Sequence, residues 1–221
     1  MARKKGKGGR RGGGGGGGNP WGSGDAYNRK AKDQGFAARS VFKLEELDSK
    51  FRLLRRGDRV LDLGACPGSW SQYALGKVGP GGLLVSVDLQ PLRADLPGAV
   101  VLQDDVFALE PEQLAEVTDG RAPPFDAVIS DMAPSTTGTP FRDHVASVEL
   151  CDRALLLASR MLVPGGVFIC KVFMGEDEPG LRQRIKERFD KVGALKPKGT
   201  RNRSVEIFLV GQGFRGGVTP S

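Results

Sequence analysis

Short apolar runs alternate along the chain with segments in which apolar residues recur every three or four positions. The short runs predict buried strands at residues 59–64, 83–88, 99–102, 125–130, 166–173 and 204–210. The segments between them predict helices at residues 69–77, 110–117, 144–162 and 180–190. Strands that alternate with helices through short turns are typical of a mostly parallel α/β sheet with helices on both faces. The last strand follows a loop instead of a clear crossover helix, so we expect it to run antiparallel.

Composition divides the 221 residues into one domain and two tails. Residues 1–24 join six basic side chains to a run of seven glycines, which cannot bury a core, so we expect a disordered basic tail. Residues 25–211 are long enough for a single well-cored domain. Helical spacing predicts that residues 25–58 form an N-terminal helical extension of this domain, and residues 212–221 are expected to be a flexible C-terminal tail.

The net charge of +7 is concentrated at the two flanks of the predicted domain. Residues 25–60 hold ten basic and six acidic side chains, and residues 181–203 hold nine basic and two acidic ones. The centre, residues 61–180, has seven basic and seventeen acidic side chains. Two separate basic blocks and a basic tail favour a polyanionic partner over a merely solvated surface, and nucleic acid is the natural polyanion.

Targeting signals and metal ligands are scarce in this sequence. The glycine-rich start lacks the apolar segment of a secretory signal, and no apolar run approaches the ~18 residues that span a membrane. Cys66, Cys151 and Cys170 are odd in number and show no CxxC spacing, which argues against a disulfide framework. His144 is the single histidine, so we expect no metal site. The expected location is the cytoplasm, without membrane association.

The segment from Val60 to Trp70 runs from an apolar strand into a glycine turn. Glycine in such a turn lets backbone N–H groups approach a ligand that a β-carbon would exclude. Asp88 ends the next strand, twenty residues after Gly68, where a carboxylate in a βαβ nucleotide fold holds ribose hydroxyls. Pro67 removes a donor and stiffens the turn, which suits S-adenosylmethionine better than the pyrophosphate of a dinucleotide.

Two further residues are candidates for contact with the same cofactor. Asp104 follows the third strand, where a carboxylate accepts a hydrogen bond from an adenine amino group. Trp70, early in the first crossover helix, either belongs to the core or forms a wall of the cofactor site. Each acid alone is an ordinary strand-end residue. Asp88 and Asp104 in this order behind a glycine turn favour a nucleoside-bearing cofactor.

Charged side chains interrupt apolar strands at two positions, Lys171 and Glu206. Burying an unpaired charge costs several kcal/mol, so both side chains require partners. Asp131 closes the fourth strand, at the edge where open α/β sheets bind ligands, and Lys43 lies in the helical extension. One isolated charge would most simply lie on an edge strand facing water. Two lysines and two acids that all need partners predict a shared cluster.

The chain resembles the RrmJ/FtsJ (RlmE) family of ribosomal RNA large-subunit 2′-O-methyltransferases over about residues 25–211. The matching segments are residues 39–45, 62–73, 130–134, 171–173 and 203–206. The resemblance implies a Rossmann-like fold dependent on S-adenosylmethionine, with a mostly parallel seven-stranded sheet. It implies a catalytic tetrad of Lys43, Asp131, Lys171 and Glu206. It also implies cofactor contacts from Gly68, Trp70, Asp88, Asp104 and Asp131, and S-adenosylhomocysteine as the product.

The implied reaction is methyl transfer to a ribose 2′-hydroxyl of the large ribosomal subunit, at a uridine of the A-loop, by an enzyme expected to be a monomer. Because the sulfonium methyl is already activated, the enzyme has to align the hydroxyl and remove its proton. We expect Lys171, transiently deprotonated, to accept this proton, and Lys43 to steady the alkoxide or a phosphate. The basic flanks, including the extension over residues 25–58, would hold the RNA.

Two positions depart from the family pattern. Ser135 stands where asparagine is usual, and Cys66 replaces a common alanine. The alternatives are a 2′-O-methyltransferase acting on tRNA or an mRNA cap, and a ribosome-assembly protein whose methylation is incidental. A nicotinamide oxidoreductase is the least favoured alternative, because Pro67 and Lys171 do not suit one.

Overall fold

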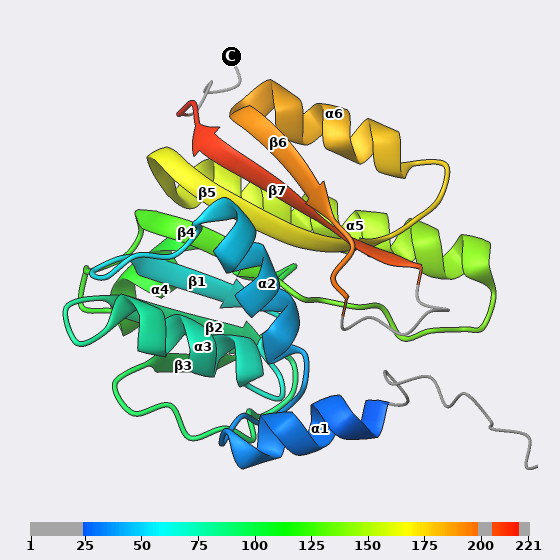
Figure 1. Cartoon of the computed structure of the whole chain (residues 1–221). Helices are drawn as coiled ribbons and strands as arrows, with labels where there is room; N and C mark the ends of the chain where they lie inside the picture. The colour runs from blue at the N-terminus through cyan, green and yellow to red at the C-terminus, as the bar shows by residue number, and fades with distance from the viewer. Residues whose placement is uncertain (1–23, 199–204, 217–221) are drawn as a thin grey trace, which may run out of the picture.

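The computed structural model describes residues 24–198 and 205–216 and contains a seven-stranded sheet. The strand order is β3-β2-β1-β4-β5-β7-β6, and only β7 runs antiparallel to its neighbours. The strands are β1 (Arg59–Leu63), β2 (Leu83–Asp88), β3 (Val100–Gln103), β4 (Phe125–Ser130), β5 (Leu162–Phe173), β6 (Phe189–Leu195) and β7 (Glu206–Phe214). The mostly parallel sheet with one late antiparallel strand is therefore confirmed (Figure 1).

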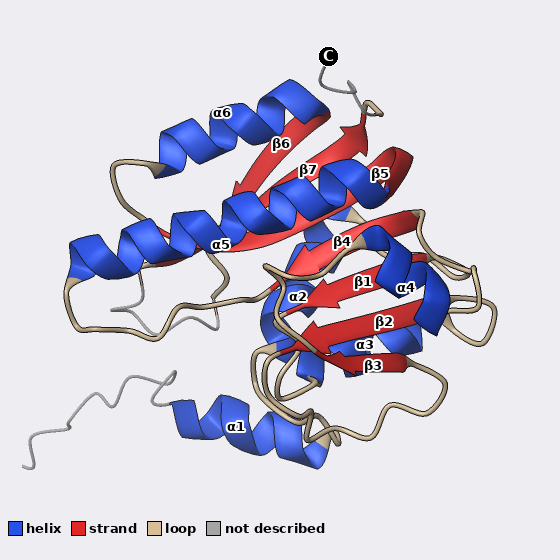
Figure 2. Cartoon of the chain, turned by 180° about the vertical axis from the view of Figure 1, so that it is seen from behind, coloured by secondary structure: helices blue, strands red, loops and turns tan. Residues whose placement is uncertain are grey.

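Helices cover both faces of the sheet, as the alternating pattern predicts. The helices are α1 (Gly24–Asp33), α2 (Val41–Phe51), α3 (Ser69–Val78), α4 (Pro111–Val117), α5 (Pro140–Met161) and α6 (Glu178–Arg188). Figure 1 shows α2 and α3 in front of the sheet, and Figure 2 shows α4, α5 and α6 on the opposite face. No helix in these described ranges is long and apolar enough to cross a membrane.

Each face of the sheet has its own apolar core. Leu44 of α2, Trp70 of α3 and Phe208 of β7 belong to the core under α2 and α3. The other core lies under α5 and α6 and contains Phe125 and Phe168. Burial of side chains on both faces explains why the central strands appear in the sequence as nearly continuous apolar runs.

The end of helix α2 packs closely against β6, where a glycine provides the necessary space. A β-carbon at Gly193 of β6 would lie 2.6 Å from the ring of Phe51, at the end of α2. The Asp48 carboxylate holds the same end of α2, because it accepts hydrogen bonds from the Leu53 and Leu54 amides and from Tyr73 Oη. These contacts fix the helix that carries Lys43.

The structure differs from the sequence-based prediction in three places. The predicted helical extension over residues 25–58 is not helical throughout, because it consists of α1 and α2 separated by residues 34–40 and ends in a turn before β1. Strand β6 was not predicted, because it lies at the sheet edge and most of its residues are exposed or half-buried instead of forming an apolar run. The domain boundary predicted at residue 211 is too early, since β7 pairs with β6 as far as Phe214. Of the predicted tails at residues 1–24 and 212–221, residues 1–23 and 217–221 lie outside the described residues.

Candidate active site

The glycine turn between β1 and α3 is shaped by two close approaches. A β-carbon at Gly64, where φ is 76°, would lie 2.5 Å from Met132 Cγ. A β-carbon at Gly68, where φ is 110°, would lie 2.5 Å from Ala94 Cβ. L-residues rarely adopt such φ values, so glycine is required here by conformation as well as by space. The close neighbours of the two glycines are Met132 and Ala94 of the protein itself, so the turn packs tightly against the loops after β4 and β2.

A cavity of about 670 Å³ lies beside this turn. Small-molecule sites in proteins usually have volumes of roughly 300–1,000 Å³. The cavity is bounded by the glycine turn, by the ends of β2, β4 and β5, and by the loop after β3. Its polar lining includes Ser40, Asp88, Asp105, Asp131, Ser135 and Lys171.

The Asp88 carboxylate is fixed by the backbone around it. Oδ2 accepts a hydrogen bond from the Cys66 amide at 2.8 Å, and Oδ1 accepts one from the Gln90 amide at 2.8 Å. Each carboxylate oxygen can accept a second hydrogen bond, so both remain available to ligand hydroxyls. This geometry suits the two adjacent hydroxyls of a ribose.

The acid after β3 that lines the cavity is Asp105, not the predicted Asp104. The Asp104 carboxylate accepts hydrogen bonds from the Asp105 amide and the Gln113 side chain. Asp105 lines the cavity, and its Oδ1 accepts a hydrogen bond from the Phe107 amide at 2.9 Å. The sequence shows two adjacent carboxylates but not the contact with Gln113, nine residues downstream, that holds Asp104 to α4. Asp105, and not Asp104, is therefore the acid placed to contact a ligand in this cavity.

Two apolar side chains of the cavity are unusually exposed, Leu89 at 66% and Phe107 at 46%. They follow β2 and β3 respectively, and Phe107 lies two residues after Asp105. Exposed apolar groups that line a concave site are typical of surfaces covered by a flat, partly apolar ligand. Neither residue was predicted from the sequence to belong to the site.

The Trp70 side chain belongs to the core instead of the cavity wall. It is 2% exposed, packs against Phe208 at 5.5 Å between ring centroids, and donates a hydrogen bond from Nε1 to the Ser40 carbonyl at 2.9 Å. Ser40 precedes α2, and its hydroxyl lies 2.7 Å from the Ser69 hydroxyl at the start of α3. Trp70 therefore fixes the start of α2, one turn before Lys43. Trp70 was predicted to be either a core residue or a wall of the cofactor site, and the core position is confirmed for its side chain.

The four predicted catalytic residues form two ion pairs. Lys171 Nζ lies 2.8 Å from Asp131 Oδ1 and donates a hydrogen bond to the Asp131 carbonyl at 2.6 Å. Lys43 Nζ lies 2.5 Å from Glu206 Oε1. All four side chains are at most 16% exposed, so each charge is largely removed from water but has a partner of opposite sign.

Strand register brings these two ion pairs to one face of the sheet. Lys171 of β5 faces Phe208 of β7, and Phe173 faces Glu206. Because alternate residues of a strand share a face, Lys171 and Glu206 are diagonal neighbours. Lys43 reaches the same place from α2, with its Nζ 5.8 Å from the centre of the Phe208 ring. The predicted cluster therefore exists, and Lys171 and Asp131 open directly into the cavity.

A fully buried carboxylate, Asp62, lies behind the glycine turn. Its Oδ2 accepts a hydrogen bond from the Ser71 hydroxyl at 2.6 Å, whereas its Oδ1 has no partner among the described residues. Burial, with smaller contributions from the charges of Asp131 and Asp88, raises the pKa of Asp62 to about 7 although the Ser71 hydrogen bond acts to lower it. The position of Asp62 inside the first strand could have singled it out, as it did for Lys171.

The loop between β4 and α5 completes the cavity. Ser135 lines the cavity from this loop, and the Asp143 carboxylate of α5 holds the loop by accepting hydrogen bonds from the Thr137 amide and hydroxyl at 2.7 and 2.8 Å. The Thr137 amide lowers the pKa of Asp143 by bonding its charged form. Over residues 24–198 and 205–216, no group of three or more histidines, cysteines or acids is placed to hold a metal ion.

A pocket of this size that opens onto the Lys171–Asp131 pair, at the carboxyl edge of this sheet, is what a Rossmann-like methyltransferase requires. The chain belongs to the FtsJ-like methyltransferase family, whose match covers residues 36–214. Two relatives carry the name ribosomal RNA large subunit methyltransferase E. The Sorangium cellulosum protein is 50% identical over 194 residues, covering 87% of this chain and 89% of the relative. The Bdellovibrio bacteriovorus protein is 51% identical over 187 residues, covering 85% and 95%.

Solved structures agree with this family assignment. A ribosomal RNA methyltransferase from Plasmodium falciparum is 26% identical, with a TM-score of 0.71 over 82% of this chain and 100% of the other. An rRNA methylase from Clostridium thermocellum is 17% identical with a TM-score of 0.51, and this second likeness concerns the fold alone. The Rossmann-like methyltransferase fold predicted from the sequence is thereby confirmed.

Proposed function

We propose that this methyltransferase transfers a methyl group from S-adenosylmethionine to a ribose 2′-hydroxyl of large-subunit ribosomal RNA. The observation that carries the proposal is the opening of the Lys171–Asp131 pair into a pocket that also presents Asp88. A cofactor bound at Asp88 and a hydroxyl approaching Lys171 would meet in this one cavity. The names of the relatives support the ribosomal substrate.

The residues of the pocket fit S-adenosylmethionine. Asp88 would accept hydrogen bonds from the ribose hydroxyls, and Asp105 would accept one from the adenine amino group. Leu89 and Phe107 would cover the adenine faces. Gly68 enters the proposal through the shape of the turn, because its N–H already donates to the Ala65 carbonyl at 2.6 Å. Trp70 enters through its main chain, because N–H groups in the first turn of a helix lack partners within that helix and suit the cofactor's carboxylate.

Asp131 has two functions in the proposal. Its carboxylate holds Lys171 Nζ at 2.8 Å and lies at the cavity surface, where it would also attract the positively charged methionine end of the cofactor. A cationic cofactor is therefore favoured over a dinucleotide, whose phosphates would meet carboxylates.

Bound S-adenosylmethionine supplies an activated methyl group, so the protein's tasks are alignment and proton removal. Lys171, in its neutral form, accepts the 2′-hydroxyl proton as the new carbon–oxygen bond forms and the carbon–sulfur bond breaks. Asp131 orients the amine through two contacts, at Oδ1 and at the main-chain carbonyl. Lys43, held by Glu206, steadies the developing alkoxide or an adjacent phosphate.

The basic flanks would hold the RNA on either side of this site. Helix α1 carries Arg29, Lys30 and Lys32, and Figure 1 shows it beside the carboxyl edge of β1 and β2. The second block begins in α6 and continues past β6, and its residues 199–203 lie outside the described ranges. We propose a monomeric cytoplasmic enzyme whose target is the A-loop uridine that the family resemblance implies.

The proton-acceptor role is tested by turnover of Lys171→Ala and Lys171→Arg on unmethylated large subunits with labelled cofactor. We expect kcat to fall by about 10²–10⁴-fold in both variants, because a guanidinium retains the charge but cannot accept the proton at neutral pH. Glu116→Ala, at an exposed position of α4 outside both basic blocks, is the control and should leave kcat unchanged. Near-normal turnover by folded Lys171→Ala would contradict the assignment.

A further inference from the structure

Strand β5 extends beyond its parallel neighbour at the point where it carries Lys171. The last pair between β4 and β5 is Ser130 with Cys170, whereas β7 continues to pair with β5 as far as Phe173. Residues 171–173 therefore have a strand on one side only. Backbone groups of Lys171 and Phe173 that face the missing neighbour need other partners, because unpaired buried N–H and C=O groups are costly.

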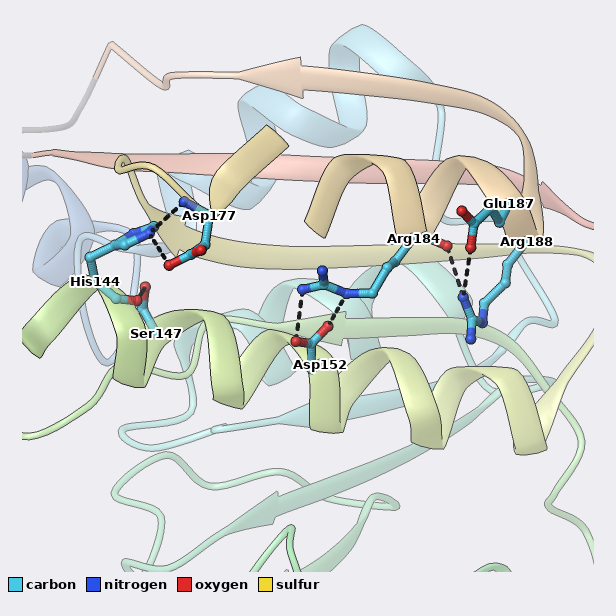
Figure 3. A network of polar contacts seen from close by, with 7 residues as sticks. All are labelled: His144, Ser147, Asp152, Asp177, Arg184, Glu187 and Arg188. Carbon is cyan, nitrogen blue, oxygen red and sulfur yellow. Dashed lines mark hydrogen bonds and ion pairs between the residues drawn. The ribbon is translucent and has the colours of Figure 1, made fainter. Parts of the chain in front are cut away.

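Three side chains of α5 supply these partners. Cys151 Sγ donates to the Lys171 carbonyl at 2.9 Å, and Ser147 Oγ accepts from the Phe173 amide at 3.1 Å. His144 Nδ1 lies 2.8 Å from the Phe173 carbonyl. The three residues are spaced by three and four positions, so they form one stripe along the helix. Figure 3 shows His144 and Ser147 on α5, with Asp177 beside the His144 ring.

Each hydrogen bond made by these three side chains has one donor and one acceptor. Ser147 donates its hydroxyl proton to the His144 carbonyl at 2.7 Å, which leaves the oxygen free to accept from Phe173. The Asp177 amide donates to His144 Nε2 at 3.1 Å, so Nδ1 carries the ring proton and donates to the Phe173 carbonyl. Cys151, Ser147 and His144 are at most 4% exposed, so water does not compete for these bonds.

We propose that His144, Ser147 and Cys151 are positioning residues that replace the missing strand and fix the main chain of Lys171 for catalysis. The inference rests on the proposed function, in which Lys171 Nζ must meet the hydroxyl in the cavity. A displacement of about 1 Å in a catalytic group can cost about 10²-fold in rate. His144, Ser147 and Cys151 do not themselves line the cavity, and their contact with the lining is the bond from Cys151 to the Lys171 main chain, so we expect their effect to reach the reaction through β5.

The test compares Cys151→Ala with Cys151→Ser, which keeps a donor for the Lys171 carbonyl. We expect Cys151→Ala and Ser147→Ala to lower kcat by about five- to tenfold, with the KM for S-adenosylmethionine within about twofold of the wild type. Cys151→Ser should retain at least about half of the wild-type kcat. Ser159→Ala is the matched control, because its hydroxyl bonds the Leu155 carbonyl within α5 and does not reach β5.

The outcomes separate positioning from stability alone. A lower melting temperature with unchanged kcat in Cys151→Ala would overturn the inference, and so would an equal loss of kcat in Cys151→Ser. If Ser147→Ala does not fold, the two Cys151 variants decide the matter. An active Lys171→Ala enzyme would refute the proposed function itself, whereas an inactive one beside fully active stripe variants would refute only the positioning role.

Discussion

Asp62 makes the folded protein sensitive to pH, and Asp62→Asn should remove that sensitivity. The carboxyl is fully buried, and its pKa is raised from 3.8 to about 7. Protonation is then favoured in the folded state, so the free energy of unfolding falls as pH rises from about 4 to about 7. The asparagine variant keeps an oxygen to accept from Ser71 but cannot ionise.

The magnitude follows from the size of the shift. A difference of about three pKa units, at about 1.4 kcal/mol per unit, makes the ionised form less stable by roughly 4 kcal/mol. Part of this penalty is already present at about pH 5, so we expect a fall of roughly 2–3 kcal/mol between about pH 5 and about pH 8. The Asp62→Asn protein should show a correspondingly smaller fall.

Urea denaturation of the cofactor-free protein, followed by circular dichroism at several pH values, measures this difference. The matched control is Asp126→Asn on β4. Hydrogen bonds from Arg59 outweigh burial and lower the pKa of Asp126, so it is ionised throughout this range and should contribute no slope. Identical pH slopes for wild type and Asp62→Asn would refute the reasoning about the buried carboxylate.

Substitutions at the two adjacent acids after β3 should have different effects on cofactor affinity measured by calorimetry. Asp105→Asn should raise the Kd for S-adenosylmethionine about tenfold, whereas Asp104→Asn should raise it less than about twofold. Equal effects would contradict the placement of Asp105 in the site. Gly68→Ala should lower the free energy of unfolding by about 2 kcal/mol, because its β-carbon meets Ala94, whereas Gly76→Ala, with open space in α3, should not destabilise. RNA affinity in filter binding should fall at least about tenfold between about 50 and about 200 mM salt, and a flat response would contradict the role of the basic flanks.

The buried part of the fold could be predicted because its strands have two covered faces. Runs such as Leu83–Asp88 consist mostly of apolar residues, and this pattern can be recognised in the sequence without knowing which strands pair with each other. Strand β6 lies at the edge, where half-exposed residues and Gly193 carry no such signal. Its pairing with β7 is a tertiary contact that local pattern does not encode.

The sequence could predict site residues whose burial costs free energy unless they have a partner. It could not predict which of two similar residues lies in the site when only tertiary contacts distinguish them. Lys171 stood out because a lysine within an apolar strand needs a partner, and the structure supplies Asp131. Asp104 and Asp105 are chemically identical and adjacent, so only the contact with Gln113 distinguishes them. Trp70 fits a core or a cofactor wall equally well until Phe208, far away in the sequence, is seen against it.

The most direct test of the central claim is to map the product. The enzyme and labelled S-adenosylmethionine would be incubated separately with unmethylated large subunits, naked ribosomal RNA and tRNA, followed by nuclease digestion and nucleoside analysis. We predict label on a ribose 2′-oxygen of large-subunit RNA, lost in Lys171→Ala and kept in Glu116→Ala. Label only in tRNA, or on a base instead of a ribose, would contradict it.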